Sequence, residues 1–202
     1  MFQQHLRQKH GHVRIEDEAR FLRSWVESPL RTGAVSPSGR FLARAMAGYV
    51  DADLPGPVIE LGPGTGPVTE ALVRRGIAES RLVLVEFNPQ FCKLLRKRFP
   101  AATVVQGDAY GLARTLDGHV SDPATAVVSS LPLFTKPLND RQGLLEDAFS
   151  LMHPGAPFVQ FTYATVPPIP KDGPDYRAQA SGRIWWNLPP ARVWVYRRAA
   201  GR

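Results

Sequence analysis

The stretch Val58-Ile-Glu-Leu-Gly-Pro-Gly-Thr-Gly66 decides the fold of this chain. It begins with a short apolar run, Val58 to Leu61, which is typical of a buried strand in a parallel sheet. The run stops at a loop with three glycines spaced two residues apart, Gly62, Gly64 and Gly66. Glycine accepts a positive φ and has no side chain to keep a ligand away from the backbone. A strand, a glycine loop and a helix in this order begin a nucleotide-binding βαβ unit.

The glycine spacing and an acid before it together indicate the charge of the ligand. The dinucleotide-binding motif places two residues between its second and third glycines, whereas Thr65 alone separates Gly64 from Gly66. Glu60 stands at the end of the strand, where its carboxylate would repel a pyrophosphate. We therefore predict a cationic or zwitterionic ligand. A tight turn after an unrelated strand is the alternative that this loop alone leaves open.

The composition is that of one globular domain. The 202 residues are 44% hydrophobic and 21% charged, and no run approaches the ~18 apolar residues of a membrane-spanning helix. The start of the chain lacks the apolar centre of a signal peptide, and the lone Cys92 fits a reducing compartment, so we expect a cytoplasmic protein. The net charge of +7 predicts an anionic partner, either nucleic acid or an anionic membrane surface.

Residues 1–28 are predicted to form amphipathic helices outside the main domain, which would occupy residues 29–202. From Ile15 to Glu27, the apolar side chains gather on one side of a helical wheel. Residues 1–14 combine basic and apolar side chains, which suits a helix lying in a membrane interface. An ordinary helix that packs on the domain is the alternative for Ile15–Glu27.

Beyond the glycine loop, apolar runs and amphipathic segments alternate along the chain. The expected strands after the first are Leu82–Glu86, Val104–Asp108, Ala126–Ser130, Pro157–Tyr163 and Val193–Arg197. The expected helices are Pro37–Val50, Val68–Arg75, Gln90–Phe99 and Arg141–Met152. This alternation predicts an α/β fold with a doubly wound, mostly parallel sheet, whose ligand binds outside the carboxyl ends of the strands. The proline-rich stretch from Ala164 to Pro190 shows no periodicity, and irregular segments of that length are usually functional or mobile.

Polar side chains stand at the ends of four expected strands. They are Glu60, Glu86, Asp108 and Ser129. In nucleoside-binding α/β folds an acid at such a strand end accepts hydrogen bonds from ribose hydroxyls, which is the role predicted for Glu86. Because the carboxyl ends of the strands meet at one edge, the four positions predict one cofactor site. No metal site is predicted, since His10 and His12 have no third ligand beside them.

The segment E-L-G-P-G-T-G resembles motif I of the class I S-adenosylmethionine methyltransferases, whose cofactor carries an amino group and a sulfonium. Two further segments are more specific, Arg31-Thr-Gly-Ala-Val-Ser-Pro-Ser-Gly-Arg40 with the following Phe41-Leu-Ala-Arg-Ala-Met46, and Ser129-Ser-Leu-Pro-Leu-Phe134. With them the chain resembles the bacterial soluble phospholipid N-methyltransferases from about Phe21 to Arg198.

This resemblance implies a seven-stranded, Rossmann-like methyltransferase sheet and S-adenosylmethionine as cofactor. It implies stepwise N-methylation of phosphatidylethanolamine to phosphatidylcholine. Residues 1–28 would dock the protein peripherally on the inner face of the membrane, and Asp108 would bind the adenine amino group. The residues expected to bind the cofactor are Glu60, Gly62, Gly64, Thr65, Gly66, Glu86, Phe87, Asp108, Ala109 and Ser129.

The phospholipid enzymes are themselves similar to the ribosomal RNA adenine dimethyltransferases, whose N-L-P-Y-type motif holds the target amine through its Asn. This chain has Ser129-Ser-Leu-Pro-Leu-Phe134 there, with no Asn and one extra residue before the aromatic. RNA is therefore disfavoured as a partner, and no protein partner is inferred. Two alternatives stay open: an RNA adenine N6-methyltransferase, and a membrane- or RNA-binding module that has lost catalysis.

Methylation of an amine needs few catalytic side chains, because positioning and desolvation carry most of the effect. The catalytic candidates are Tyr176, Ser129 and Arg177, and the further candidate phosphate partners are Lys136 and Arg183. We prefer Tyr176 to Tyr163 as the residue that binds the amine or its phosphate. Trp185 and Trp186 would hold a methylated ammonium by cation–π contact, or else pack in the core.

Overall fold

The computed structural model describes residues 37–198, so the helices predicted within residues 1–28 lie outside the described residues. The helices are α3 (Pro37–Ala47), α4 (Pro67–Arg74), α5 (Pro89–Arg98), α6 (Leu112–Thr115) and α7 (Leu138–Ser150), with 3-10 turns η1 (Glu79–Arg81), η2 (Ala109–Gly111) and η3 (Leu133–Thr135). The strands are β1 (Val58–Leu61), β2 (Leu82–Glu86), β3 (Thr103–Gln106), β4 (Ala126–Ser129), β5 (Phe158–Thr162), β6 (Tyr176–Ala180) and β7 (Arg192–Arg198). Within residues 37–198, no helix has the length and apolarity needed to cross a membrane.

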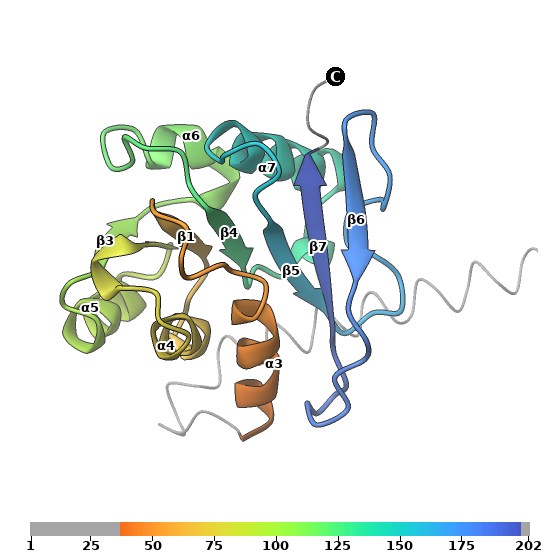
Figure 1. The fold of residues 1–202 in the computed structure, drawn as a ribbon, viewed down its shortest axis with the longest axis horizontal. Helices are drawn as coiled ribbons and strands as arrows, with labels where there is room; N and C mark the ends of the chain where they lie inside the picture. Colours follow the sequence, from red (N-terminus) through yellow and green to blue (C-terminus); the bar gives the residue numbers. More distant parts are fainter. Residues whose placement is uncertain (1–36, 199–202) are drawn as a thin grey trace, which may run out of the picture.

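The seven strands form one sheet in the order β3-β2-β1-β4-β5-β7-β6 (Figure 1). Strands β1 to β5 are parallel, and β7 runs antiparallel to both of its neighbours. The chain first builds the sheet outward from β1 to β3 and then returns to β4, so the switch point lies between β1 and β4. The prediction of a doubly wound, mostly parallel sheet is confirmed. We call the edge where β1 to β5 end the carboxyl edge, which is where such folds bind ligands.

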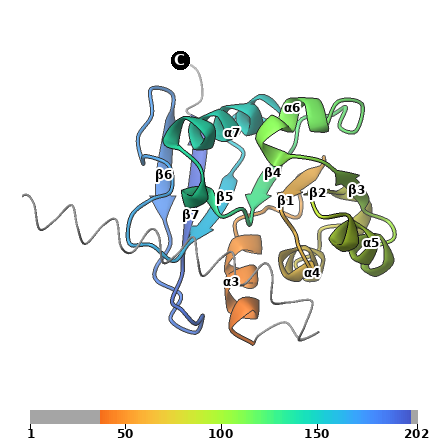
Figure 2. The ribbon, with the colours of Figure 1, turned by 180° about the vertical axis from the view of Figure 1, so that it is seen from behind.

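Helices cover both faces of the sheet. One face packs against α3, α4 and α5, and the other against α6 and α7 (Figures 1 and 2). Successive residues of a strand therefore enter different cores: Val58 joins the α4 side and Ile59 the α7 side. This burial on both faces explains why β1 and β2 are almost continuously apolar. By the same alternation Glu60 faces α4 and Ser129 faces α7.

The stretch from Ala164 to Pro190 is not irregular throughout, so that prediction was wrong in part. It contains β6, an edge strand that pairs with β7 alone. Only Tyr176 of this strand is buried, and its other residues are half-buried or exposed. An edge strand with so little burial lacks the apolar alternation by which strands are recognised in a sequence.

Candidate cofactor and amine site

The glycine loop after β1 has the backbone geometry that its sequence predicts. Gly62, Gly64 and Gly66 have φ angles of 67°, 57° and 85°, which disfavour other residues. A Cβ on Gly66 would lie 2.7 Å from the ring of Phe99, and a Cβ on Gly62 would lie 2.9 Å from Leu131. A Cβ on Gly64 would meet nothing within 4 Å. The outer glycines thus allow close packing, whereas Gly64 leaves room for a ligand to approach the backbone.

Glu86, at the end of β2, connects this loop to the next one. Its Oε2 accepts a hydrogen bond from the Gly64 N–H at 3.0 Å, and its Oε1 accepts one from the Asn88 N–H at 2.8 Å. Because each carboxylate oxygen accepts two hydrogen bonds, Glu86 retains acceptor capacity for two ribose hydroxyls. Phe87 follows it with an exposed ring, which is available to pack against a base.

Glu60 is a fully buried carboxyl group with one satisfied oxygen. Its Oε2 accepts a hydrogen bond from the Thr69 hydroxyl of α4 at 2.7 Å, whereas Oε1 has no partner among the described residues. Burial raises the pKa of Glu60 from 4.5 to about 8, although the bonds from Thr69 oppose this shift. An unpaired buried acceptor at the glycine loop fits the cationic amino group of S-adenosylmethionine, since an ammonium would both bond Oε1 and favour the ionised carboxylate.

The third acid lies just beyond its strand rather than in it. Strand β3 ends at Gln106, and Asp108 follows as an exposed residue whose Oδ1 accepts a hydrogen bond from the Tyr110 N–H at 2.9 Å. Ala109 is buried against α7, so it can offer a ligand only backbone groups. The half-buried Thr65 has its carbonyl bonded by Arg98. All the residues predicted to bind the cofactor therefore stand at or beside the carboxyl edge.

Ser129 has a neighbour that the sequence analysis missed, Gln160 of β5. The two residues are paired in register and their side chains point to the α7 side. Gln160 Nε2 donates to the carbonyls of Leu131 at 3.1 Å and Phe161 at 2.8 Å, so its Oε1 is oriented away from both carbonyls. Oε1 is buried and has no partner among the described residues. A lone polar residue inside the apolar segment Phe158-Val-Gln-Phe was the signal that could have identified it.

The structure does not bring Tyr176 to this edge. The registers of the last four strands place Ala180 level with Ser129. Tyr176 begins β6 four residues earlier, roughly 13 Å nearer the opposite edge at ~3.3 Å per residue. Its ring is buried between Phe149 and Tyr196, with ring centroids 6.1 Å away on each side. Tyr176 is thus a core side chain.

Among the other predicted amine and phosphate partners, Arg177 alone lies toward the opposite edge. Arg177 lies beside Tyr176 and pairs with exposed Asp172 at 3.5 Å. Tyr163, the less favoured tyrosine, directly follows β5 and so lies at the carboxyl edge, as does Lys136 after η3. Arg183 lies in the loop between β6 and β7. Within residues 37–198, no three His, Cys, Asp or Glu side chains are grouped so that they could hold a metal ion.

The sheet order, the glycine loop, the acids at the ends of β1 and β2 and the acid after β3 together form a class I S-adenosylmethionine methyltransferase fold. Residues 58–155 match the family model described as "Methyltransferase domain". The chain is also similar to an ornithine lipid N-methyltransferase from Singulisphaera acidiphila, at 29% identity over 151 residues that cover 73% of this chain and 79% of the relative. S-adenosylmethionine is the cofactor of this chain.

Two further similarities concern other substrates. A ribosomal RNA small subunit methyltransferase A from Synechococcus is 44% identical over 54 residues, but the match covers 25% of this chain and 18% of the relative. The solved structure of an O-methyltransferase from Bacillus cereus in complex with SAH has a TM-score of 0.60 at 16% identity, covering 91% of this chain and 90% of that one. This last likeness shows the fold alone.

Proposed function

We propose that the protein transfers methyl groups from S-adenosylmethionine to the primary amine of a membrane lipid, phosphatidylethanolamine, toward phosphatidylcholine at the inner face of the membrane. The observation that carries this proposal is the buried, unpartnered Oε1 of Gln160 beside Ser129. An acceptor in that position suits a substrate that presents N–H groups, as an amine does. The similarity to a lipid N-methyltransferase supports a lipid as the carrier of that amine.

The residues of the carboxyl edge divide the work of such a transfer. The bound cofactor supplies a methyl group from its sulfonium. Once the methyl group has been transferred, the sulfur remains as a neutral thioether. Glu60 and Glu86 would hold the cofactor at its amino group and its ribose. Gln160 Oε1 would orient the amine by accepting a hydrogen bond from one of its N–H groups, so that the nitrogen lone pair faces the methyl group. Burial of the amine disfavours its ammonium form, which has no lone pair to donate.

Ornithine lipid is a second candidate substrate, because the relative that covers most of this chain is named for it. Ornithine lipid also presents a primary amine, so the same Gln160 acceptor suits it. The ribosomal RNA enzymes offer less support, since their match is confined to 54 residues. This chain also lacks the Asn of their amine-binding motif and carries Ser129-Ser130 instead.

The test is transfer of a labelled methyl group by the full chain to four separate acceptors. These are vesicles containing phosphatidylethanolamine, vesicles containing ornithine lipid, vesicles of phosphatidylcholine alone, and ribosomal RNA. We expect label in phosphatidylethanolamine and none in phosphatidylcholine or RNA. Label confined to ornithine lipid would keep an amine lipid as substrate and change its identity, whereas label in RNA alone would overturn the proposal.

A further inference from the structure

Four large apolar side chains stand exposed together at one end of the molecule. Three lie in the loop between β6 and β7: Trp185, Trp186 and Leu188 are 71%, 78% and 83% exposed. Phe41 of α3 is 44% exposed and contacts Trp186, with ring centroids 6.2 Å apart. We call these four residues the aromatic tip. Exposed apolar side chains are ordinary when scattered, but a contiguous group indicates an interaction surface.

The aromatic tip lies at the carboxyl edge. Arg192, which begins β7, pairs with the last residue of β5, so the loop that precedes it projects past that edge. Figures 1 and 2 show this loop and the start of α3 at the end of the molecule toward which β4 and β5 point. Whatever covers the aromatic tip therefore lies on the side of the molecule that holds Ser129 and the glycine loop.

The exposure of the tryptophans is built into the loop. Ile184 and Ala191 pair across it, with N–H to O distances of 2.8 and 3.3 Å. Between them Asn187 is buried, and its Nδ2 donates a hydrogen bond to the Pro189 carbonyl at 2.8 Å. A loop closed from within by its own asparagine leaves the neighbouring Trp186 and Leu188 directed outward.

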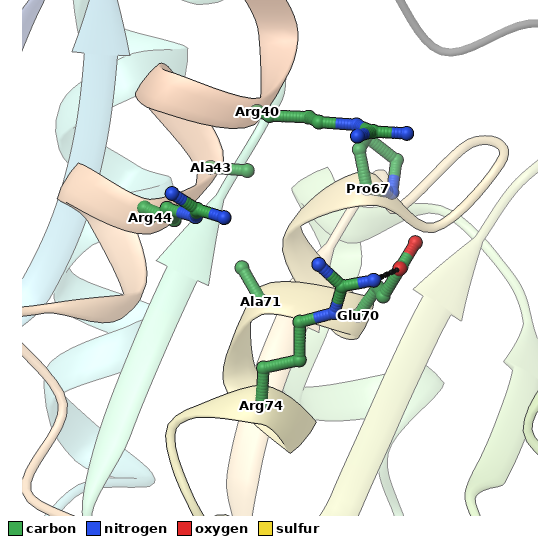
Figure 3. Close-up of a pocket in the computed structure, with 7 residues that line it drawn as sticks. All are labelled: Arg40, Ala43, Arg44, Pro67, Glu70, Ala71 and Arg74. Atoms are coloured by element: carbon green, nitrogen blue, oxygen red, sulfur yellow. Dashed lines mark hydrogen bonds and ion pairs between the residues drawn. The ribbon is translucent and has the colours of Figure 1, made fainter. Parts of the chain in front are cut away.

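Arginines lie beside the aromatic tip on both elements. Arg183 has its guanidinium 5.8 Å from the ring of Trp185. Arg40 and Arg44 of α3 are exposed and line a pocket with Arg74 of α4, as Figure 3 shows. The acid in this pocket, Glu70, is already paired with Arg74 at 2.5 Å, and no ion pair to Arg40 or Arg44 is found in the described part of the chain. The surface around the tip is therefore positively charged.

We propose that the aromatic tip inserts into the interface of an anionic lipid bilayer, while Arg40, Arg44 and Arg183 contact the lipid headgroups. Tryptophan is enriched at the headgroup level of membranes, and basic side chains are attracted to anionic lipids. RNA would also attract the arginines and stack on the tryptophans, but the most exposed tip residue, Leu188, has no ring to stack on a base. The inference rests on the proposed lipid substrate, for which it supplies the surface that brings bilayer and cofactor together.

The experiment compares a tip variant, Trp185→Ser/Trp186→Ser/Leu188→Ser, with the otherwise unchanged full chain. Vesicles contain phosphatidylethanolamine and phosphatidylglycerol with brominated acyl chains, which quench nearby tryptophan emission. A Trp25→Phe background removes the signal of that residue, so that emission comes from the tip pair and the buried Trp194. Leu54→Ser is the matched control, because Leu54 is 49% exposed in the loop that precedes β1, at the opposite edge.

We expect quenching of the parent, and vesicle binding by the tip variant at least tenfold weaker in co-sedimentation, with Leu54→Ser unchanged. Cofactor affinity should stay within twofold, since the replaced side chains are exposed. Methylation of phosphatidylethanolamine dispersed in detergent should be retained, whereas methylation in vesicles should fall about as much as binding.

Unquenched emission in the parent, or full vesicle binding by the tip variant, would overturn the bilayer inference. If ribosomal RNA binds through the tip instead of vesicles, the surface is a nucleic-acid site and the inference is wrong. The outcomes also separate the two proposals. Binding through the tip without methylation of any lipid refutes the proposed substrate alone, whereas vesicle methylation that persists in the tip variant refutes the docking surface alone.

Discussion

The two halves of the carboxyl edge differ in how their polar groups are satisfied. On the side of β1 and β2, Glu86 accepts hydrogen bonds from two backbone N–H groups. These bonds hold two adjacent loops in place before any ligand binds. On the side of β4 and β5, Gln160 has its donors bonded but its acceptor unpaired, and the aromatic tip is exposed to solvent. A preformed half suits a cofactor that is common to many enzymes. Under the proposed function, Gln160 in the other half would bind the substrate amine, and the exposed aromatic tip would contact the bilayer.

Glu60 is the exception within the preformed half, and it gives the largest expected effect. Its pKa is raised to about 8 by burial, above the value of 4.5 in an unfolded chain, so the folded protein retains a proton across that interval. The free energy of unfolding of the wild type, taken relative to that of Glu60→Gln, should therefore be highest below about pH 4.5. This difference should fall by about 1 kcal/mol per pH unit between about pH 4.5 and about pH 8. Urea unfolding from pH 5 to 8 measures this difference.

Cofactor binding sharpens the same prediction, because a bound ammonium favours the ionised form of Glu60. Affinity for S-adenosylmethionine should rise with pH below about pH 8 in the wild type and stay nearly flat in Glu60→Gln. Asp172→Asn, at an exposed acid far from the site, is the control and should follow the wild type. Parallel unfolding profiles for the wild type and Glu60→Gln would show that no proton is held at Glu60.

The glycine loop should separate a packing role from a ligand role. Gly66→Ala combines a positive φ with a clash against Phe99, and we expect it to lower the free energy of unfolding by about 2–4 kcal/mol. Gly64→Ala bears the backbone cost alone, about 1–2 kcal/mol, yet should lose more cofactor affinity than stability. Chemical denaturation and titration calorimetry together check both variants. Equal losses of stability would mean that Phe99 moves aside.

A substitution at Gln160 tests the half of the edge at β4 and β5, which we call the substrate half. We expect Gln160→Leu to lower kcat/KM for the lipid amine roughly tenfold, because it removes the acceptor that we propose orients the amine. The dissociation constant of S-adenosylmethionine should be unchanged, since Gln160 lies on the α7 side of the sheet and Glu60 on the other. Gln179→Leu, at an exposed position of β6, is the matched control. A parallel loss of cofactor affinity would indicate a structural role instead.

The smallest effect is expected at Tyr176, outside both halves. Tyr176→Phe retains the ring that packs between Phe149 and Tyr196, so methyl transfer should change less than twofold. Steady-state kinetics with the lipid substrate measure this. A tenfold or greater loss would return Tyr176 to the active site and contradict the boundary that the strand register draws.

The sequence by itself determined the central part of the sheet and the cofactor half of the site. Strands such as β2 are buried on both faces and therefore consist of apolar residues throughout, which makes them visible without a structure. The glycines of the loop directly follow β1, and the acids Glu60 and Glu86 stand at the ends of β1 and β2 themselves. Their common location follows from parallel topology alone, because all carboxyl ends meet at one edge.

Tertiary structure alone decided the substrate half. Tyr176, which the sequence analysis expected at the site, lies away from the carboxyl edge because the register of an antiparallel pair depends on pairing between distant segments, and β6 has too little burial to show its own alternation. Gln160 was not predicted at all, because only the pairing of β4 with β5 places it beside Ser129. The tryptophan pair was read as either core or ligand cage, since an aromatic pair in a sequence carries no sign of which way it faces. That direction was set by the closure of the loop around Asn187, a contact that exists only once β6 and β7 are paired.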